Sequence, residues 1–214
     1  QLKQALENKN YEDAFRGAHT LKGVCQNLSF DRLYEVSHEL TELLRDRTGE
    51  QPGIPEAMEK VTEVYEMTIE EIKKRMEALS PDIVIGMKYL YSNMPYSDVG
   101  NYTFDTYLDY VQQGIYLWEN SPYVKNYPEL YFLNYVLFHR TNDEEIKPCR
   151  TYFWKKIKDK VQGKAMVEAA LEINHWCAGE VMYQGTDMRT GSALEIYRSG
   201  VGRCGEEAVF VVNV

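Results

Sequence analysis

The sequence lacks several features that mark common classes of protein. No uninterrupted apolar stretch approaches the roughly 18 residues that a membrane-spanning helix needs. Basic residues are outnumbered: 24 Lys and Arg stand against 33 Asp and Glu, which gives a net charge of −9. Because a surface this acidic repels phosphate backbones, we expect no nucleic acid as a partner, and the lack of an apolar span argues against a membrane.

Cysteine is also sparse. The four cysteines, Cys25, Cys149, Cys177 and Cys204, form no CxxC pair and no Cys/His cluster with zinc-ligand spacing. This pattern argues against a disulfide framework and a structural metal site. We therefore expect no metal and no cofactor, and a reducing, cytoplasmic location.

Both ends lack the usual terminal signals. The sequence starts at Gln1 without an initiator Met or the basic and apolar segments of a signal peptide. It stops in an apolar run over residues 208–214 that has no polar cap. We expect both ends to be internal to a longer polypeptide, or the chain to join two unrelated fragments.

Aromatic residues divide the chain near Ser80-Pro81, where the residue before proline is disfavoured in a helix. Only five aromatic residues precede Ser80, namely Tyr11, Phe15, Phe30, Tyr34 and Tyr65. We expect a mainly α protein with a helical bundle over 1–79, an aromatic-rich helical region over 80–160, and a further core that starts at 161 and runs to 214.

Apolar residues recur every three to four positions in the first part, as on the buried face of a helix. Three long helices are predicted, over about 11–28, 33–44 and 57–76, and short connections favour an up-and-down bundle. Only residues 2–7 remain for a fourth helix, and they are too few to cover a bundle of this length. We expect the first helix of a four-helix bundle to be missing or supplied from elsewhere.

The first long helix carries a polar group of residues on one face. His19, Lys22, Gly23 and Gln26 occupy positions i, i+3, i+4 and i+7. An exposed imidazole is nucleophilic when neutral, and a nearby cation can stabilise a phosphoryl group on it. Glycine inside a helix costs about 1 kcal/mol relative to alanine, so Gly23 favours close approach by a partner. The alternative is an ordinary surface histidine beside a surface lysine.

Residues 18–28 (AHTLKGVCQNL), together with Leu33 and the His38-Glu39-Leu40 stretch, resemble the histidine phosphotransfer (HPt) domain of bacterial phosphorelays. The resemblance covers about residues 1–78. It implies that His19 accepts a phosphoryl group from an aspartate of a receiver domain and passes it to another receiver, without kinase activity of its own. It also implies that Lys22 and Gly23 shape the surroundings of His19 and that Gln26 is a polar neighbour.

The middle of the chain is rich in tyrosine and tryptophan but has no catalytic motif. Helices are predicted over 87–91, 104–116, 130–138 and 152–161. Their aromatic residues suit a core. Alternatively, they line a groove for a peptide or a sugar, which would make this region a non-catalytic binding module.

A cysteine follows a glycine-rich loop near the end of the chain. A helix is predicted over 165–181, then a short strand over 181–184 and a helical turn over 192–197. If residues 208–214 are also helical, Cys204 lies at the N-terminus of that helix, where the free N–H groups favour a thiolate. The alternative is a buried structural cysteine.

Residues 173–176 (INHW), 183–184 (YQ), Asp187, 189–190 (RT) and 202–207 (GRCGEE) resemble the transglutaminase-like cysteine superfamily. The resemblance implies an α+β core and acyl transfer or amide hydrolysis by Cys204 on a protein or peptide substrate. Such enzymes use Cys, then His, then Asp in chain order, through a thioester. The four histidines, His19, His38, His139 and His175, all precede Cys204, so we expect this catalytic site to be incomplete.

Overall fold

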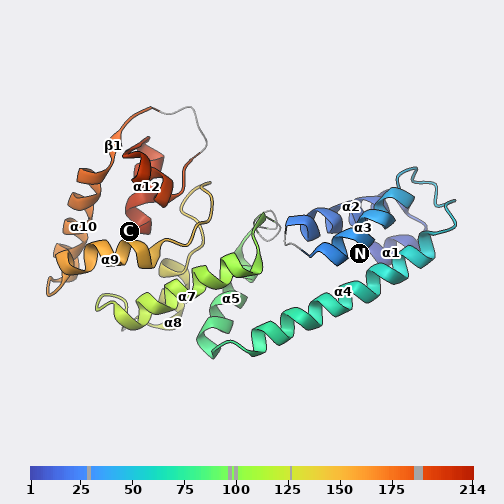
Figure 1. The fold of residues 1–214 in the computed structure, drawn as a ribbon, viewed down its shortest axis with the longest axis horizontal. Helices are drawn as coiled ribbons and strands as arrows, with labels where there is room; N and C mark the ends of the chain where they lie inside the picture. Colours follow the sequence, from blue (N-terminus) through green and yellow to red (C-terminus); the bar gives the residue numbers. More distant parts are fainter. Residues whose placement is uncertain (28–29, 96–97, 99–100, 126, 186–189) are drawn as a thin grey trace. The chain divides into compact units, whose positions relative to one another are not determined.

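The computed structural model describes the whole chain except residues 28–29, 96–97, 99–100, 126 and 186–189 (Figure 1). Helices dominate it, which confirms the mainly α fold class.

The contacts divide the chain into two compact units. Unit 1 consists of Gln1–Val84 and Asn93–Phe104, and unit 2 consists of Ile85–Ser92 and Asp105–Val214. Each unit is described separately below. The finer division into three domains stays a prediction.

Unit 1 is built around antiparallel helices joined by short connections. α2 packs against both α1 and α3, and α3 packs against α4. The three predicted long helices are therefore present, with ends shifted by a few residues. Their bounds are α1 (Leu2–Glu7), α2 (Tyr11–Asn27), α3 (Asp31–Leu43) and α4 (Ile54–Glu77).

Short and aliphatic side chains form the core of unit 1. Ala14 and Ala18 of α2 have no exposed surface. Because these side chains are short, α2 can approach the neighbouring helices closely. The buried cluster comprises Ala14, Ala18, Leu40, Leu44, Ile54, Ala57 and Val61.

Asn10 fixes the start of α2. Its carbonyl accepts the first helical bond, from Ala14 N at 3.0 Å. Its side-chain oxygen accepts a bond from Asp13 N at 3.1 Å, and its amide donates to the Asp13 carboxylate at 2.7 Å. Asparagine at this position satisfies an N–H group that the helix leaves free, so the local sequence sets where the helix carrying His19 begins.

An open hollow of about 1160 Å³ lies beside α1 in unit 1. Its lining includes Leu21 and Val24 of α2 and Met58 and Tyr65 of α4. At 1.5 Å per residue, six-residue α1 is about 9 Å long, whereas 17-residue α2 is about 26 Å long. α1 therefore covers only part of the apolar flank, as the sequence predicted.

Unit 2 contains helices that differ in length and type. Most of α5 (Pro81–Asn93) belongs to it. The further helices are α7 (Phe104–Asn120), α8 (Glu129–Tyr131), the π-helix η1 (Phe132–Val136), α9 (Arg150–Val161), α10 (Met166–Glu180), α11 (Ala193–Ser199) and α12 (Cys204–Asn213).

The strands described in unit 2 are very short. β1 (Met182–Tyr183) pairs in parallel with β2 (Val201–Gly202), and Met182 lies opposite Val201. The predicted strand after the 165–181 helix is therefore present. The packing of this region nevertheless comes from helices, since α10 contacts both α9 and α12, and α11 contacts α12.

Aromatic rings fill much of the core of unit 2. Phe153 of α9 is fully buried and meets Phe210 of α12 edge-on, at 5.5 Å between ring centroids. Tyr197 of α11 contacts the same two rings. The buried cluster comprises Cys149, Phe153, Cys177, Val181, Ala193, Ile196, Val209 and Phe210.

A buried arginine ties the end of the π-helix to this unit. Arg150 donates to the carbonyls of Val136 and Phe138 at 2.6 and 3.2 Å, and to the Tyr110 hydroxyl at 2.8 Å. Its guanidinium also lies 4.2 Å from the centroid of the Tyr110 ring. Carbonyls at a helix end need donors, and Arg150 supplies them here.

Candidate functional site

The candidate site residues of unit 1 lie along α2. The helix buries Ala18 completely but exposes His19 and Gln26. Lys22 and Gly23 are partly buried. Because a helix repeats every 3.6 residues, these four residues share one face of α2. The structure therefore brings all four together, with the imidazole open to solvent.

Gly23 lies in the interior of α2 without a packing reason. A Cβ atom at this position would meet no other atom within 4 Å. Neither close packing nor a left-handed backbone requires glycine here. The missing side chain instead leaves open space one turn beyond His19.

α3 adds an acidic side chain near Lys22 that the sequence analysis missed. Two hydrogen bonds from Arg45, at 2.6 and 2.9 Å, are the main cause of the lowered pKa of Glu42. The charges of His38 and Lys22 lower it further. His38 Nδ1 lies 3.8 Å from the Glu42 carboxylate. The i, i+4 spacing of His38 and Glu42 could have indicated that these two side chains pair. It could not have indicated that the pair lies near Lys22.

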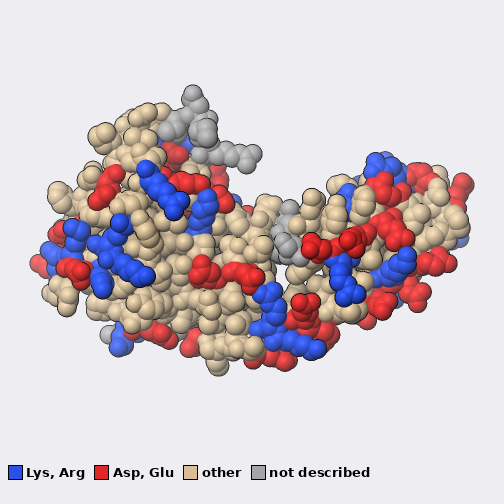
Figure 2. Space-filling view, in the orientation of Figure 1, with Lys and Arg blue, Asp and Glu red and all other residues tan. Residues whose placement is uncertain are grey.

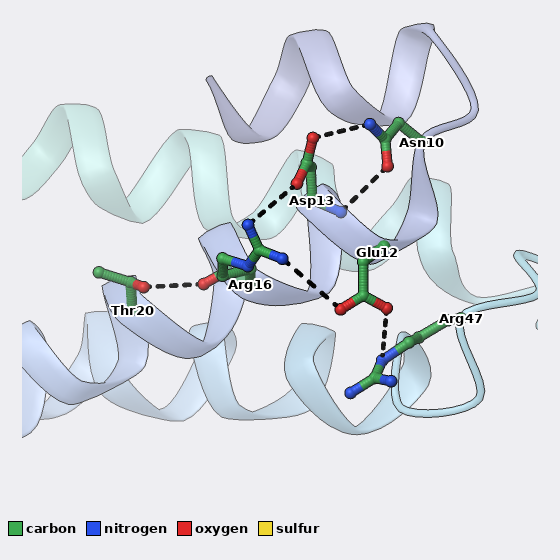
Figure 3. A network of polar contacts seen from close by, with 6 residues as sticks. All are labelled: Asn10, Glu12, Asp13, Arg16, Thr20 and Arg47. Carbon is green, nitrogen blue, oxygen red and sulfur yellow. Dashed lines mark hydrogen bonds and ion pairs between the residues drawn. The ribbon is translucent and has the colours of Figure 1, made fainter.

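A second set of contacts lies on the N-terminal side of His19, and Figure 3 shows the part of it formed by Glu12, Arg16 and Arg47. The Phe15 and His19 rings, one helical turn apart, have centroids 5.9 Å apart and planes tilted by 37°. The Arg47 guanidinium lies 4.9 Å from the Phe15 ring centroid. Arg47 Nε is also 3.1 Å from Glu12, which is 3.8 Å from Arg16. Arg47 was not predicted, because it comes from the loop after α3 and not from the helix that carries His19.

Charges of both signs are interspersed on the face of the molecule drawn in Figure 2. Some of the ion pairs in unit 1 join neighbouring helices, such as Lys60 of α4 and Glu39 of α3 at 3.2 Å. Others join residues of one helix, such as Arg16 and Asp13 at 3.5 Å. Several acidic side chains of unit 1 are therefore paired with a nearby basic side chain.

The candidate site residue of unit 2 lies at the start of a helix. Cys204 is the first residue of α12, and its side chain is exposed. Glu206, one turn into the helix, is buried and accepts bonds from Arg203 N at 2.9 Å and Gly191 N at 3.2 Å. The predicted helix is thus present, and it begins earlier than the apolar run.

The other cysteines have a different environment. Cys25, Cys149 and Cys177 are buried, and burial raises the pKa of each to about 11. A raised pKa suppresses the thiolate, which is the reactive form. Exposure therefore distinguishes Cys204 from the other three.

The remaining motif positions of the C-terminal segment are only partly described. His175 is exposed on α10, and Thr190 is partly buried. Asp187 and Arg189 lie outside the described residues, as does Leu28 of the first motif.

An aromatic hollow of about 350 Å³ lies beside η1 in unit 2. Its lining includes Tyr131, Tyr135 and Phe138, which are 55%, 77% and 48% exposed. Tyr89 also lines it and donates to Asn134 at 2.9 Å. A groove for a peptide or a sugar at the aromatic helices stays a prediction.

The described residues contain no group of three or more His, Cys, Asp and Glu side chains that could hold a metal ion. No helix among them has the length and apolar character needed to cross a membrane. The cytoplasmic location stays a prediction.

Comparisons with known proteins bear on the first part of the chain. The family model described as the Hpt domain matches residues 1–81. This match confirms the resemblance stated for about residues 1–78. No curated protein and no solved structure matches the chain. None of these findings supports the transglutaminase-like resemblance of the C-terminal segment.

Proposed function

We propose that residues 1–81 act as a histidine phosphotransfer module in a phosphorelay, with His19 as the residue that carries the phosphoryl group. The observation that supports this most is the exposed imidazole of His19 on the same face of α2 as Lys22, Gly23 and Gln26. The match of residues 1–81 to the Hpt domain supports the same function. Hpt domains typically interact with receiver domains, which are the partners we propose.

The transfer takes place between His19 and a receiver aspartate. An unprotonated ring nitrogen attacks the phosphorus of the aspartyl phosphate. The N–P bond forms as the P–O bond breaks, and the aspartate carboxylate leaves with the electron pair. The proton on the other ring nitrogen passes to solvent. The reverse sequence returns the phosphoryl group to the aspartate of a second receiver.

The neighbours of His19 have separate roles in this proposal. Lys22, one turn further along α2, places a positive charge where the phosphoryl oxygens lie in the transition state. Gly23 leaves room for the receiver to approach the imidazole. Gln26 offers an amide to the partner or to a phosphoryl oxygen.

Phosphorylation by a phosphorylated receiver domain tests the assignment of His19. The wild-type chain should acquire phosphate that is labile in acid and stable in base, and His19→Gln should acquire none. His38→Gln is the matched control, because His38 is the other histidine of α2–α4 and its side chain is 48% exposed. Equal labelling of His19→Gln and the wild type would show that the assignment is wrong.

Substitution of Gly23 tests the open approach to the imidazole. Gly23→Leu should slow transfer from the receiver by about 10-fold or more, since misplacement of reacting groups by 1 Å can cost 10²-fold. The fold should remain intact, because the new side chain points into open space. Gly179→Leu is the control: a Cβ there also meets nothing within 4 Å, but Gly179 lies on α10 in unit 2. A wild-type transfer rate in Gly23→Leu would contradict the proposed role.

We infer a second candidate function for unit 2, cysteine acyl transfer or amide hydrolysis on a protein or peptide substrate. Its support is the exposed position of Cys204 as the first residue of α12, where the thiol is accessible to a substrate. The thiolate would attack a glutamine carboxamide, form a thioester and release ammonia. The leaving ammonia needs a proton from a general acid, which contributes about 10²–10⁴-fold. No histidine follows Cys204 in these 214 residues, so we expect slow turnover.

Two measurements test this second candidate. Iodoacetamide should modify Cys204 faster than Cys25, Cys149 or Cys177. Peptide mass spectrometry measures the rate of modification at each cysteine. Ammonia release from glutamine-containing peptides should be slow and should disappear in Cys204→Ala. If Cys204 reacts no faster than the buried cysteines, or if Cys204→Ala releases ammonia at the wild-type rate, this function is excluded.

A further inference from the structure

We propose that Arg47 is a positioning residue for His19, acting through the ring of Phe15. The inference rests on the proposed phosphotransfer function. It concerns a side chain in the loop between α3 and α4, outside the polar group on α2.

The first step is the contact between the two rings. Helical side chains lean toward the N-terminus and cover the preceding turn, so the imidazole of His19 extends over Phe15. The 5.9 Å between the ring centroids and the 37° tilt agree with this direction. Phe15 is partly buried and also packs against the buried cluster of unit 1. Its ring is therefore the surface that backs the imidazole and limits its rotation.

The second step is the contact between Arg47 and the same ring. A guanidinium within about 6 Å of a ring centroid is attracted by the ring, and that of Arg47 lies at 4.9 Å. The attraction favours one orientation of the Phe15 ring over others. Through that ring, Arg47 influences how the imidazole of His19 is presented to a partner.

The third step is how Arg47 itself is held. Its Nε lies 3.1 Å from the Glu12 carboxylate, and Arg16 lies 3.8 Å from Glu12 (Figure 3). The backbone of Arg47 has φ of 58°, a left-handed conformation that is uncommon for a residue with a side chain. Its amide nevertheless donates to the carbonyl of Leu44 at 3.0 Å. Glu12 of α2 thus holds the guanidinium, and the loop holds the backbone of Arg47, as positioning requires.

The test uses the full chain and compares Arg47→Ala with Lys60→Ala. Lys60 is the matched control, since it also forms an exposed ion pair with another element of unit 1, in its case with Glu39 of α3. Two phosphodonors are used: a phosphorylated receiver and phosphoramidate, which transfers its phosphoryl group to imidazole and releases ammonia. The NMR signal of His19 Cε1–H, assigned with His19→Gln, reports the ring directly because Phe15 shifts it.

Arg47→Ala should move the His19 signal and slow labelling from both donors by about 2- to 5-fold, the effect of one exposed cation–π contact. Lys60→Ala should change neither. Arg47→Lys should restore both readouts in part, because a lysine ammonium can also lie over the ring. In a Phe15→Leu background, Arg47→Ala should have no further effect, since the side chain that links them is gone.

Several results would overturn the proposal. One is an unchanged His19 signal in Arg47→Ala. Another is slowing with the receiver alone, which would make Arg47 a contact for the partner rather than a positioning residue. A third is an equal effect of Arg47→Ala with and without Phe15. If the wild-type chain takes no label from either donor, the proposed function fails, and the NMR signal alone then decides whether Arg47 orients His19.

Discussion

The two units fill their interiors in opposite ways. In unit 1 the fully buried residues of α2 are Ala14 and Ala18, whose small size brings helices together. In unit 2 the buried space around α9 is occupied by Phe153, with Phe210 and Tyr197 against it. The core beside α2 in unit 1 therefore has little room for a larger side chain. The core of unit 2 is stabilised by the large rings that fill it. The same kind of core substitution should therefore act differently in each unit.

The three tryptophans allow the units to be followed separately. Trp118, Trp154 and Trp176 all belong to unit 2, and the sequence has no other tryptophan. Tryptophan fluorescence therefore reports unit 2 alone, whereas circular dichroism reports the helices of both units.

Removal of volume from unit 2 should have the largest effect on stability. Phe153→Ala should lower the free energy of unfolding of unit 2 by about 3–5 kcal/mol, because it removes a buried ring and leaves a cavity. Urea unfolding followed by tryptophan fluorescence measures this change. Tyr135→Ala is the control, because Tyr135 is 77% exposed. Equal midpoints for the two variants would show that Phe153 does not support the core.

Addition of volume to unit 1 should have a smaller effect. Ala18→Leu should destabilise unit 1 by about 1–3 kcal/mol, since the extra methyl groups have no space beside α2. Circular dichroism should detect the loss, while the tryptophan transition stays in place. Ala78→Leu, at an exposed position after α4, provides the control. A shift of the tryptophan transition in Ala18→Leu would contradict the independent behaviour of the two cores.

A carboxylate of unit 2 should give the smallest effect, and a dependence on pH. Hydrogen bonds from Lys147, followed by those from Ser192, lower the pKa of Glu195 to about 2. This pKa lies below the unfolded value of about 4.3. The carboxylate therefore stabilises the fold fully above that value, and the contribution is lost as the pH falls toward 2.

Glu195→Gln should accordingly lower the stability of unit 2 at neutral pH and weaken its pH dependence between about 5 and 2. The loss in free energy of unfolding should stay below about 1 kcal/mol, because the side chains of Lys147 and Glu195 are both substantially exposed. Urea midpoints from tryptophan fluorescence across this pH range measure it. Glu119→Gln, an exposed glutamate of α7, should keep the wild-type slope, and an identical slope in Glu195→Gln would refute the assignment.

Features formed by residues of a single helix could be predicted from the sequence. The apolar repeat of α2 and the polar group that includes His19 and Gln26 need only the geometry of a helix. Arg47 was missed because its contact with Phe15 joins residues far apart in the chain. Glu206 was part of the 202–207 motif, but the bond it accepts from Gly191 in a preceding loop was not predicted, for the same reason.

The helix predicted over 130–138 is present, but the sequence did not indicate its unusual turn. The structure has a single turn of α-helix, α8, followed by the π-helix η1. In η1 the amide of Leu137 bonds to the carbonyl of Phe132 at 2.9 Å. A short run of apolar residues does not distinguish the wider turn from an α-helical one, because both can bury adjacent residues such as Phe132 and Leu133.

The loop that carries Arg47 also contains Gly49, whose φ of 71° lies in the left-handed region. A Cβ atom there would overlap the ring of Tyr11, the first residue of α2. In a library of random variants selected only for folding, position 49 should therefore return glycine, whereas position 23 should accept alanine. Selection for phosphotransfer should keep glycine at both positions. Comparing the residues that the two selections keep at positions 49 and 23 thus separates the requirements of folding from those of phosphotransfer.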